Sequence, residues 1–324
     1  MANNKFHTIF KNKSDVFVKS TNGKEHIVVL AGGMSAEREV SLSSSKGVIA
    51  ALIERGYKVT MVDMGADLGS VLQELQPDIV YNCLHGTYGE DGSVPGLLNI
   101  MRIKYTHAGV LGSAVAFNKA KSREIFTSNN IKCAPAILIH RNERIKKDPM
   151  PRPYVIKPLT QGSSIGVEVI FQGDDFDFAK YEYEYGEQII VEKYIKAREL
   201  QIAVLNGKAL GVLELKLLKN RFFDYEAKYT DGFTEHILPA NISKSVHMRA
   251  MEISENACTL LQASKGIARV ELLYSDEEDE LYMLEVNTHP GMTPLSICPE
   301  IAAYIGMDFR DLVEQIVRGA AYEE

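Results

Sequence analysis

Four polar residues near the end of the chain are spaced so that they can meet on one face of a hairpin. Arg269 and Glu271 lie on one β-prone run, and Glu285 and Asn287 lie on the next. If the runs pair antiparallel around Glu278, the two glutamates lie opposite each other, as do the arginine and the asparagine. Two carboxylates and an amide oxygen are hard ligands, suited to magnesium held together with phosphates. The arginine beside them can stabilise charge that develops in a transition state.

A solvated charged face is the alternative interpretation of this hairpin. It is weakened by the apolar residues on the other face, which indicate strands of a sheet: Val270, Leu272, Leu284 and Val286. The acidic segment 276–280 between the runs predicts a solvated hairpin tip rather than a metal site. Residues 288–293 follow the second run, and Gly291 there lets a backbone N–H approach a substrate.

Two other segments suit a phosphorylated ligand. Residues 157–166 (KPLTQGSSIG) lie between predicted strands; their small residues can wrap a phosphate, and Lys157 adds a point charge. This is not a Walker A loop, because no Gly-Lys-Ser/Thr opens a helix, and a plain hairpin connection stays possible.

Residues 192–195 (EKYI) end an apolar strand at a hinge, with Glu199 beyond. That edge can recognise a purine, or it can be surface charge.

Size and composition limit the kind of protein. A chain of 324 residues with 45% apolar and 24% charged residues predicts two or three compact lobes. A net charge of −7 gives no basic field for nucleic acid. The scattered cysteines predict reduced core thiols: Cys83, Cys133, Cys258 and Cys298. No apolar run approaches a membrane span, and the N-terminus lacks a signal core, so we expect a cytoplasmic protein without membrane or nucleic-acid partners.

The elements that must position these residues begin with an α/β unit. Alternating strands and helices predict a doubly wound parallel sheet from strands 26–30, 58–63 and 78–84 and helices 41–55 and 68–75. Ligands collect at the carboxyl ends of such strands, where Gly32-Gly33 and His85-Gly86 lie. Residues 1–24 are predicted to be a poorly ordered arm.

Two further units follow. The second is predicted to contain a helix over 113–130, strands over 134–139, 154–157, 166–171 and 188–194, a loop over 141–153 and a helix near 176–185. The third is predicted to contain a hairpin turning at Asn206-Gly207 between strands 199–205 and 208–218, a helix over 243–263, strands over 267–274 and 280–287, and a helix over 308–322.

In this order, these features resemble the ATP-grasp superfamily and, more specifically, the D-alanine–D-alanine ligase family. The resemblance rests on residues 30–42 (LAGGMSAEREVSL), 85–96 (HGTYGEDGSVPG), and 223–229 (FDYEAKY) combined with 284–293 (LEVNTHPGMT). It covers about residues 26–320. It implies a three-lobed ATP-grasp fold, in which a parallel-sheet domain precedes two α+β lobes that clasp ATP. The expected division is an arm over 1–24, a substrate-binding domain over 25–107, a central domain over 108–195 and a catalytic domain over 196–324.

The resemblance also implies a reaction. One D-alanine carboxylate attacks the γ-phosphate of ATP, and the amine of a second D-alanine then displaces phosphate to form a dipeptide for peptidoglycan. Such a transfer depends on positioning and charge neutralisation more than on a covalent enzyme group. Two Mg²⁺ or Mn²⁺ ions and a homodimer are implied as well.

Individual roles follow from the same resemblance. It places Glu37 on the first substrate's ammonium, His85 near that substrate, and Arg269 and the Gly291 backbone on the oxyanion. It assigns the phosphates to Lys119, Lys157 and Lys228, with Ser163 in the glycine loop. It assigns adenine and ribose to Glu192, Lys193, Ile195 and Glu199, and the metal to Glu271, Glu285 and Asn287. It links the lobes through Glu37, Ser163 and Tyr229, and places the second substrate at Ser296 and Tyr229.

Taken without the resemblance, several of these residues have plainer interpretations. Glu37 can simply start a helix, and His85 can be a satisfied histidine at a strand end. Tyr229 can be loop surface, and Lys119 can be a solvent-exposed helix residue.

The sequence departs from the family pattern at three positions. Glu271 stands where many members have Asp, which leaves the metal spacing open. His289 and Leu295 stand at positions near the second substrate that other residues often fill. Which second substrates the site accepts therefore stays open.

Three other functions compete with the dipeptide ligase. A sister ligase would join D-alanine to D-lactate or D-serine, but Tyr229 favours D-alanine. A non-catalytic nucleotide-binding protein would lack metal ligands or phosphate lysines, and none is missing. A dinucleotide-dependent oxidoreductase is disfavoured because residues 31–36 lack the third glycine of the GxGxxG spacing.

Overall fold

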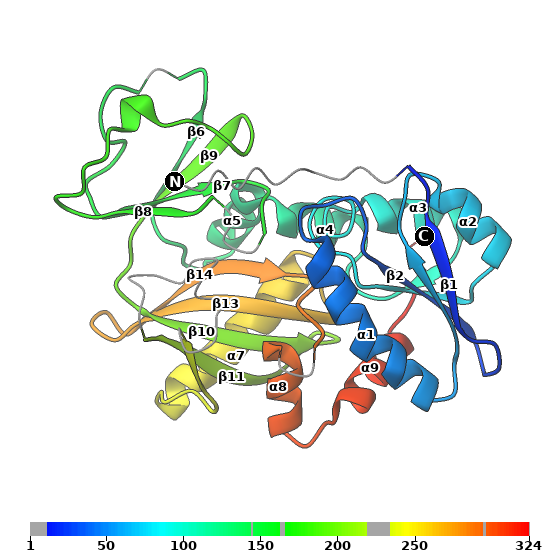
Figure 1. Cartoon of the computed structure of the whole chain (residues 1–324). Coiled ribbons are helices and arrows are strands. Elements are labelled where there is room, and N and C mark those ends of the chain that lie inside the picture. The colour runs from blue at the N-terminus through cyan, green and yellow to red at the C-terminus, as the bar shows by residue number, and fades with distance from the viewer. Residues whose placement is uncertain (1–11, 144, 163–165, 219–233, 294–295, 324) are drawn as a thin grey trace.

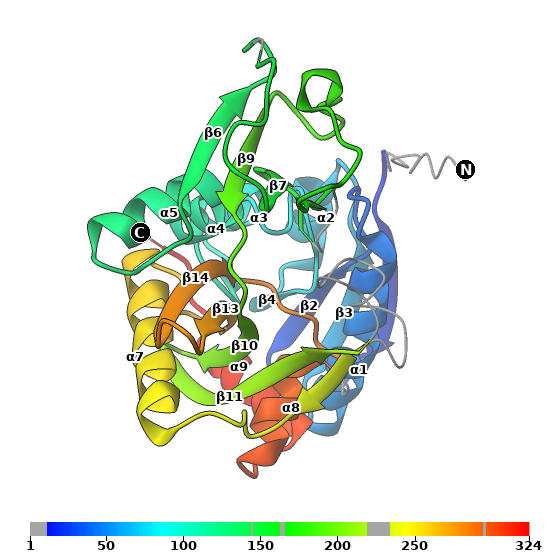
Figure 2. The same cartoon turned by 90° about the vertical axis from the view of Figure 1, so that its left-hand side faces the viewer.

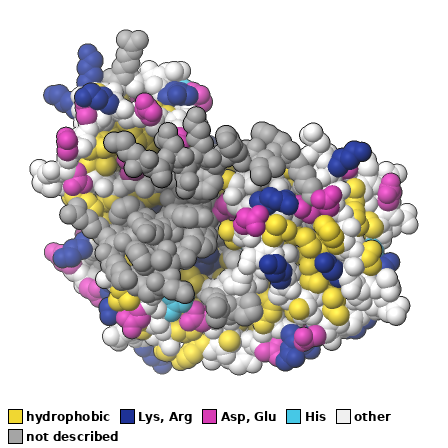
Figure 3. All heavy atoms as spheres, viewed as in Figure 1, with side chains coloured by type: hydrophobic (Ala, Val, Ile, Leu, Met, Phe, Trp, Pro, Cys, Tyr) yellow, Lys and Arg dark blue, Asp and Glu magenta, His cyan; other side chains and the backbone are white. Residues whose placement is uncertain are grey.

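Three β-sheets organise the chain, as a computed structural model of the protein shows (Figure 1). The structure describes residues 12–143, 145–162, 166–218, 234–293 and 296–323. The predictions for Ser163, Lys228, Tyr229 and Leu295 therefore lie outside the described residues. No helix in the described ranges is long and apolar enough to cross a membrane. On the face seen in Figure 3, acidic and basic side chains are interspersed over the described surface.

The N-terminal sheet is the predicted doubly wound parallel sheet. Its parallel strands run in the order β3-β2-β4-β5, with β2 (His26–Ala31), β3 (Lys58–Asp63), β4 (Ile79–Asn82) and β5 (Lys104–Tyr105). Helix α1 (Arg38–Glu54) covers one face, and α2 (Leu68–Leu75) and α3 (Ser93–Met101) cover the other. Alternate residues of β2 enter the two cores, because side chains of a strand point alternately to opposite faces.

The prediction of a poorly ordered arm over 1–24 is wrong for residues 15–20. They form β1 (Asp15–Ser20), which pairs antiparallel with the edge strand β3. Ser14 anchors its start, since its N–H donates to Asp67 Oδ1 over 2.6 Å and its hydroxyl accepts from Gly65 N over 2.9 Å. The edge of the parallel sheet offers unpaired backbone groups that this segment satisfies.

The central sheet is antiparallel in the order β6-β9-β7-β8, with β6 (Ala136–His140), β7 (Tyr154–Pro158), β8 (Glu168–Ile170) and β9 (Gln188–Lys193). The helix predicted over 113–130 is two helices, α4 (Val110–Phe117) and α5 (Lys119–Ser128). Asn118 breaks it, because its extended backbone lets its side chain accept from Lys121 N and cap α5. The helix predicted near 176–185 is only the short 3₁₀ turn η1 (Phe178–Lys180), where the Phe178 and Tyr181 rings stack.

The C-terminal sheet runs in the order β12-β11-β10-β13-β14, with β10 (Arg198–Leu205), β11 (Lys208–Leu217), β12 (Thr234–Ile237), β13 (Ile267–Ser275) and β14 (Glu280–Asn287). Helix α7 (Lys244–Leu260) packs on β10 and β11 (Figure 2). The predicted Asn206-Gly207 turn is confirmed, and both residues have positive φ.

Two C-terminal helices join this sheet to the N-terminal sheet. They are α8 (Ile297–Tyr304) and α9 (Phe309–Arg318), and α9 packs on α1 (Figure 1). One hydrophobic core contains residues of both helices, of α1 and of β10 and β11. Neither α3 nor α8 was expected from the sequence, and the helix predicted over 308–322 ends at Arg318.

The predicted hairpin register is confirmed where the polar residues lie. Arg269 pairs with Asn287, and Glu271 pairs with Glu285. A β-bulge after Glu271 then shifts the pairing, so that Leu272 lies opposite Met283. The expectation that Leu284 shares the buried face is therefore wrong, because Met283 enters that core and Leu284 lines a pocket instead.

Candidate active site

Two pockets and a narrow space between them lie among the three sheets. The inner pocket, of about 500 Å³, is lined by residues that include Glu37, Ser44, His85, Glu90, Gly162, Gln201, His236, Arg269, Asn287, His289, Gly291 and Ser296. The outer pocket, of about 310 Å³, is lined by residues that include Val155, Lys157, Glu192, Lys193, Tyr194, Ile195, Glu199, Leu273 and Leu284. Lys119, Gln161, Gly162, Glu285 and Asn287 line the space between them.

The β13–β14 hairpin brings Arg269, Glu271, Glu285 and Asn287 together. Glu271 is 4% exposed, and its Oε1 accepts from Arg269 Nε over 3.1 Å. Burial disfavours the arginine's charge, but the neighbouring Glu271 carboxylate raises the pKa of Arg269 above its usual value. Asn287 is fixed as well, because its Oδ1 accepts from His289 N over 2.8 Å.

Lys119 lies over the space between the pockets rather than in solvent. Its Nζ donates to the Gln161 carbonyl over 2.7 Å and lies 3.7 Å from Glu285 Oε2. Only 15% of its side chain is exposed. A cation held beside the Glu285 carboxylate and a glycine loop is suited to bind a phosphate.

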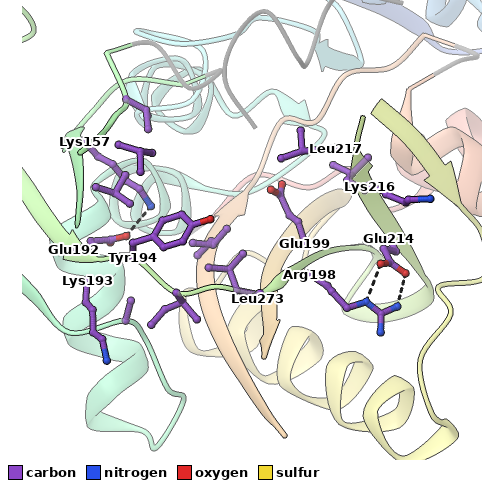
Figure 4. Close-up of a pocket in the computed structure, with 18 residues that line it drawn as sticks. Lys157, Glu192, Lys193, Tyr194, Arg198, Glu199, Glu214, Lys216, Leu217 and Leu273 are labelled. Carbon is purple, nitrogen blue, oxygen red and sulfur yellow. Dashed lines mark hydrogen bonds and ion pairs between the residues drawn. The ribbon is translucent and has the colours of Figure 1, made fainter. Parts of the chain in front are cut away.

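Glu192 holds a second lysine in place (Figure 4). It is buried, and its carboxylate accepts from Lys157 Nζ over 2.7 Å and from Arg123 Nη1 over 3.2 Å. Burial alone would raise the pKa of Glu192, but Lys157 and Arg123 lower it below its usual value. Sequence reasoning missed Arg123, which is on α5 and far from Glu192 in the chain.

The outer pocket combines an apolar slot with polar ends (Figure 4). Val155, Ile195, Leu273 and Leu284 line it with apolar side chains, and Lys193 and Tyr194 line it as well. At the far end, Glu199 Oε1 accepts from Gln201 Nε2 over 2.8 Å. Gln201 was also missed. It is 1% exposed, and its Oε1 has no hydrogen-bond partner among the described residues.

Glu37 and His85 lie at the N-terminal side of the inner pocket. Glu37 occupies the residue before α1, but its side chain makes no capping bond. Its carboxylate lies beside both Gly86 and Gly162, where an added Cβ would meet it at 2.8 and 3.0 Å. His85 Nδ1 lies 3.4 Å from Glu90 Oε1, and among the residues that the structure describes its buried Nε2 has no hydrogen-bond partner. Within the described residues, the ring of His85 is therefore only partly satisfied.

The far wall of the inner pocket is the turn between β14 and α8. Ser296 Oγ accepts from Thr293 N over 3.1 Å and lies close to Gly291. The turn is tied to α1, because Met292 N donates to Ser44 Oγ over 3.3 Å. Gly291 and Ser296 thus line one pocket together with Glu37 and His85.

His289 lines this pocket and packs on a second buried histidine, His107, which sequence reasoning missed. His107 and His289 stack with ring centroids 4.7 Å apart. Burial lowers the pKa of His107 to about 3 and that of His289 well below its usual value. Burial thus disfavours the charged form of both rings.

The donor set suits magnesium chemically, because carboxylate and amide oxygens are hard ligands. It consists of two carboxylates and one amide. Because its third donor is Asn287, this set is not a cluster of three His, Cys, Asp or Glu side chains. No such cluster suited to a metal ion occurs among the residues that the structure describes.

This arrangement of sheets and pockets defines an ATP-grasp protein. The fold matches the structure of a D-alanine–D-alanine ligase from Bacillus anthracis complexed with ATP, with a TM-score of 0.79 and 26% identity, over 91% of this chain and 97% of that one. Residues 112–318 match the family described as the D-ala D-ala ligase C-terminus. The chain belongs to the D-alanine–D-alanine ligase family.

Relatives match nearly the whole chain. A D-alanine–D-alanine ligase of Rickettsia felis is 61% identical over 320 residues, which cover 99% of each chain. One of Rickettsia canadensis is 63% identical over 302 residues, which cover 93% of this chain and 85% of that protein.

Proposed function

We propose that the protein joins two D-alanine molecules into D-alanyl-D-alanine, with ATP cleaved to ADP and phosphate by phosphoryl transfer to the first D-alanine. Near-full-length relatives that carry this name support the proposal. The structural observation that carries it is the pairing of Glu271 with Glu285 and of Arg269 with Asn287. This pairing places two carboxylates, an amide oxygen and a cation between the outer and the inner pocket.

ATP occupies the outer pocket in this proposal. The adenine lies in the slot bordered by Lys193 and Ile195, and Glu199 receives the ribose. The phosphates extend toward Lys157 and Lys119, whose positions Glu192 and Gln161 fix. The expected role of Glu192 is revised to positioning Lys157, because two cations already engage its carboxylate.

Magnesium or manganese would be held by Glu271, Glu285 and Asn287. A bound divalent ion would neutralise the negative charge of the phosphates and polarise the transferred phosphoryl group. The side chains fit such an ion, since Glu285 keeps 26% of its side chain exposed. Asn287 Oδ1 retains a second lone pair beyond the one that His289 N uses. Two ions per site are proposed.

The first D-alanine lies in the inner pocket, with its ammonium on Glu37 and its carboxylate near His85. One carboxylate oxygen attacks the γ-phosphorus, the bond to the ADP oxygen breaks, and D-alanyl phosphate forms. The amine of the second D-alanine, held near Ser296, then attacks the acyl carbon. Arg269 and the Gly291 N–H stabilise the oxyanion. The C–O bond breaks, phosphate leaves and the amine loses a proton. Ser163, Lys228 and Tyr229 keep their proposed roles.

The cellular setting is also a proposal. We infer that the product serves peptidoglycan synthesis and that the protein acts in the cytoplasm as a homodimer, as the family resemblance implies. The domain division at residues 25–107, 108–195 and 196–324 follows from the same resemblance.

An ADP-release assay with matched substrates tests the function. We expect ADP release with Mg²⁺ and D-alanine alone, and almost none with L-alanine. D-lactate added at equal concentration should not compete as second substrate. ATP binding without turnover, or a strong preference for D-lactate, would contradict the proposal.

A further inference from the structure

Asn82 is a buried hydrogen-bond hub that the proposed reaction does not use. It is the last residue of β4 and is 3% exposed. Its Oδ1 accepts from Leu84 N over 3.0 Å, which fixes the orientation of the amide. Its Nδ2 therefore donates to two acceptors, the Gly89 carbonyl and His289 Nε2, each at 3.1 Å.

These contacts also fix the state of His289. Because Asn82 donates to Nε2, that nitrogen accepts and carries no proton, so the ring proton lies on Nδ1. Thr288 Oγ1 lies 3.1 Å from Nδ1 and accepts that proton's hydrogen bond. The ring of His107 stacks on the ring of His289 at an interplanar angle of 21°.

The network continues to Asn287. His289 N donates to Asn287 Oδ1 over 2.8 Å, so the placement of the histidine ring and the orientation of the asparagine are linked through one residue. In the other direction, Asn82 holds the Gly89 carbonyl in the loop that begins with His85. One chain of hydrogen bonds thus joins the first-substrate loop of the N-terminal sheet to an oxygen ligand of the C-terminal sheet.

We propose that Asn82 and His289 are a positioning pair that aligns Asn287 for the divalent metal with the His85 loop for the first substrate. The inference rests on the metal ligands of the proposed function. It requires no direct contact of either side chain with the reacting atoms. The hydrogen bond between Asn82 and His289 connects β4 of the N-terminal sheet to the segment that follows β14 of the C-terminal sheet. Removing a residue that orients a metal ligand commonly changes metal affinity.

A matched pair of substitutions at His289 separates positioning from bulk. In H289Q the amide oxygen can reach the position of Nε2 and accept from Asn82, whereas in H289N the shorter side chain ends near the position of Nδ1 and cannot. The two introduced side chains, glutamine and asparagine, both carry a primary amide and differ by one methylene group. H26L is the control, because His26 is also buried and bonds Thr60 Oγ1 over 2.9 Å, but it lies within the N-terminal sheet.

The measurement is Mn²⁺ binding to the full chain in the presence of ADP, followed by the spin-resonance signal of free Mn²⁺. We expect H289N to raise the half-saturating Mn²⁺ concentration about tenfold, and N82L to raise it similarly. The double variant N82L/H289N should add little to either. H289Q and H26L should stay within about twofold of the wild type, as expected where the ligand-orienting contact is kept.

Three results would overturn the inference: equal Mn²⁺ affinity of H289N and H289Q, a double variant whose effect is the product of the single effects, or a shift of the same size in H26L. A wild-type protein that binds no Mn²⁺ with ADP would overturn it together with the metal assignment. Metal binding without ADP release from D-alanine would contradict only the proposed function, so the two failures are distinguishable.

Discussion

Glu271 and Glu285 lie opposite each other in the β13–β14 ladder but have different surroundings. Glu271 is buried and accepts from Arg269, whereas Glu285 keeps about a quarter of its side chain exposed and lies 3.7 Å from Lys119. The difference arises because β14 is the edge strand of the sheet. Glu285 is thus the carboxylate more accessible to an incoming metal–nucleotide complex.

Glu285→Gln should remove most turnover and leave the fold intact. The substitution keeps the shape but removes the charge that a divalent ion needs, so kcat should fall by roughly 100-fold or more. Melting temperature should change little, because the side chain is partly exposed. Glu277→Gln in the exposed hairpin tip is the control and should keep full activity. A nearly fully active Glu285→Gln enzyme would show that the metal assignment is wrong.

Glu192→Gln should destabilise the protein in a pH-dependent way. The variant leaves Lys157 and Arg123 without their buried carboxylate, and breaking such a pair costs about 3–5 kcal/mol. The folded pKa of Glu192 is lowered from 4.5, so its stabilisation is present above pH 4.5 and is lost as pH falls through the lower folded value. Urea unfolding at pH 7 and pH 3 tests this. An equal difference from the wild type at both pH values would contradict the ion-pair explanation.

Gln201→Leu should weaken ATP binding more than D-alanine binding. The variant removes the amide that donates to Glu199 Oε1, the proposed ribose contact. A hydrogen bond to a charged group contributes about 1.5–3 kcal/mol, so KM for ATP should rise about tenfold or more. The fold should tolerate leucine, because the substitution also removes a buried oxygen that has no hydrogen-bond partner in the part of the chain that the structure describes. Initial rates at varied ATP and fixed D-alanine measure the effect, and an unchanged KM for ATP would exclude this role.

Arg38→Gln should raise KM for D-alanine. Arg38 Nη1 donates to Asp63 Oδ1 over 2.6 Å and to the Gly33 carbonyl over 3.1 Å, which fixes the turn that carries Glu37. Without this pair, KM should rise about tenfold. Asp63→Asn should behave alike, and the double variant should add little. Arg55→Gln at the other end of α1 is the control. If Arg38→Gln changes only the melting temperature, the pair is structural and does not position Glu37.

The sequence by itself determined the elements whose pattern is local. The two-residue period of strands predicted the facing pairs around Glu271, and the Asn206-Gly207 turn predicted its hairpin, because each hairpin joins strands that are consecutive in the chain. Motif resemblance brought Glu37, His85, Gly291 and Ser296 to one pocket. The β-bulge that turns Leu284 into the outer pocket left no such local signal.

Only the tertiary structure decided which distant side chains meet. Asn82, His107 and His289 form one network although His289 lies 207 residues beyond Asn82. Arg123 and Glu192 similarly meet from a helix and a strand. Each of these contacts depends on how two elements pack. No periodicity or short motif encodes such a contact, because its energy comes from burial and hydrogen bonding that exist only after the sheets have come together.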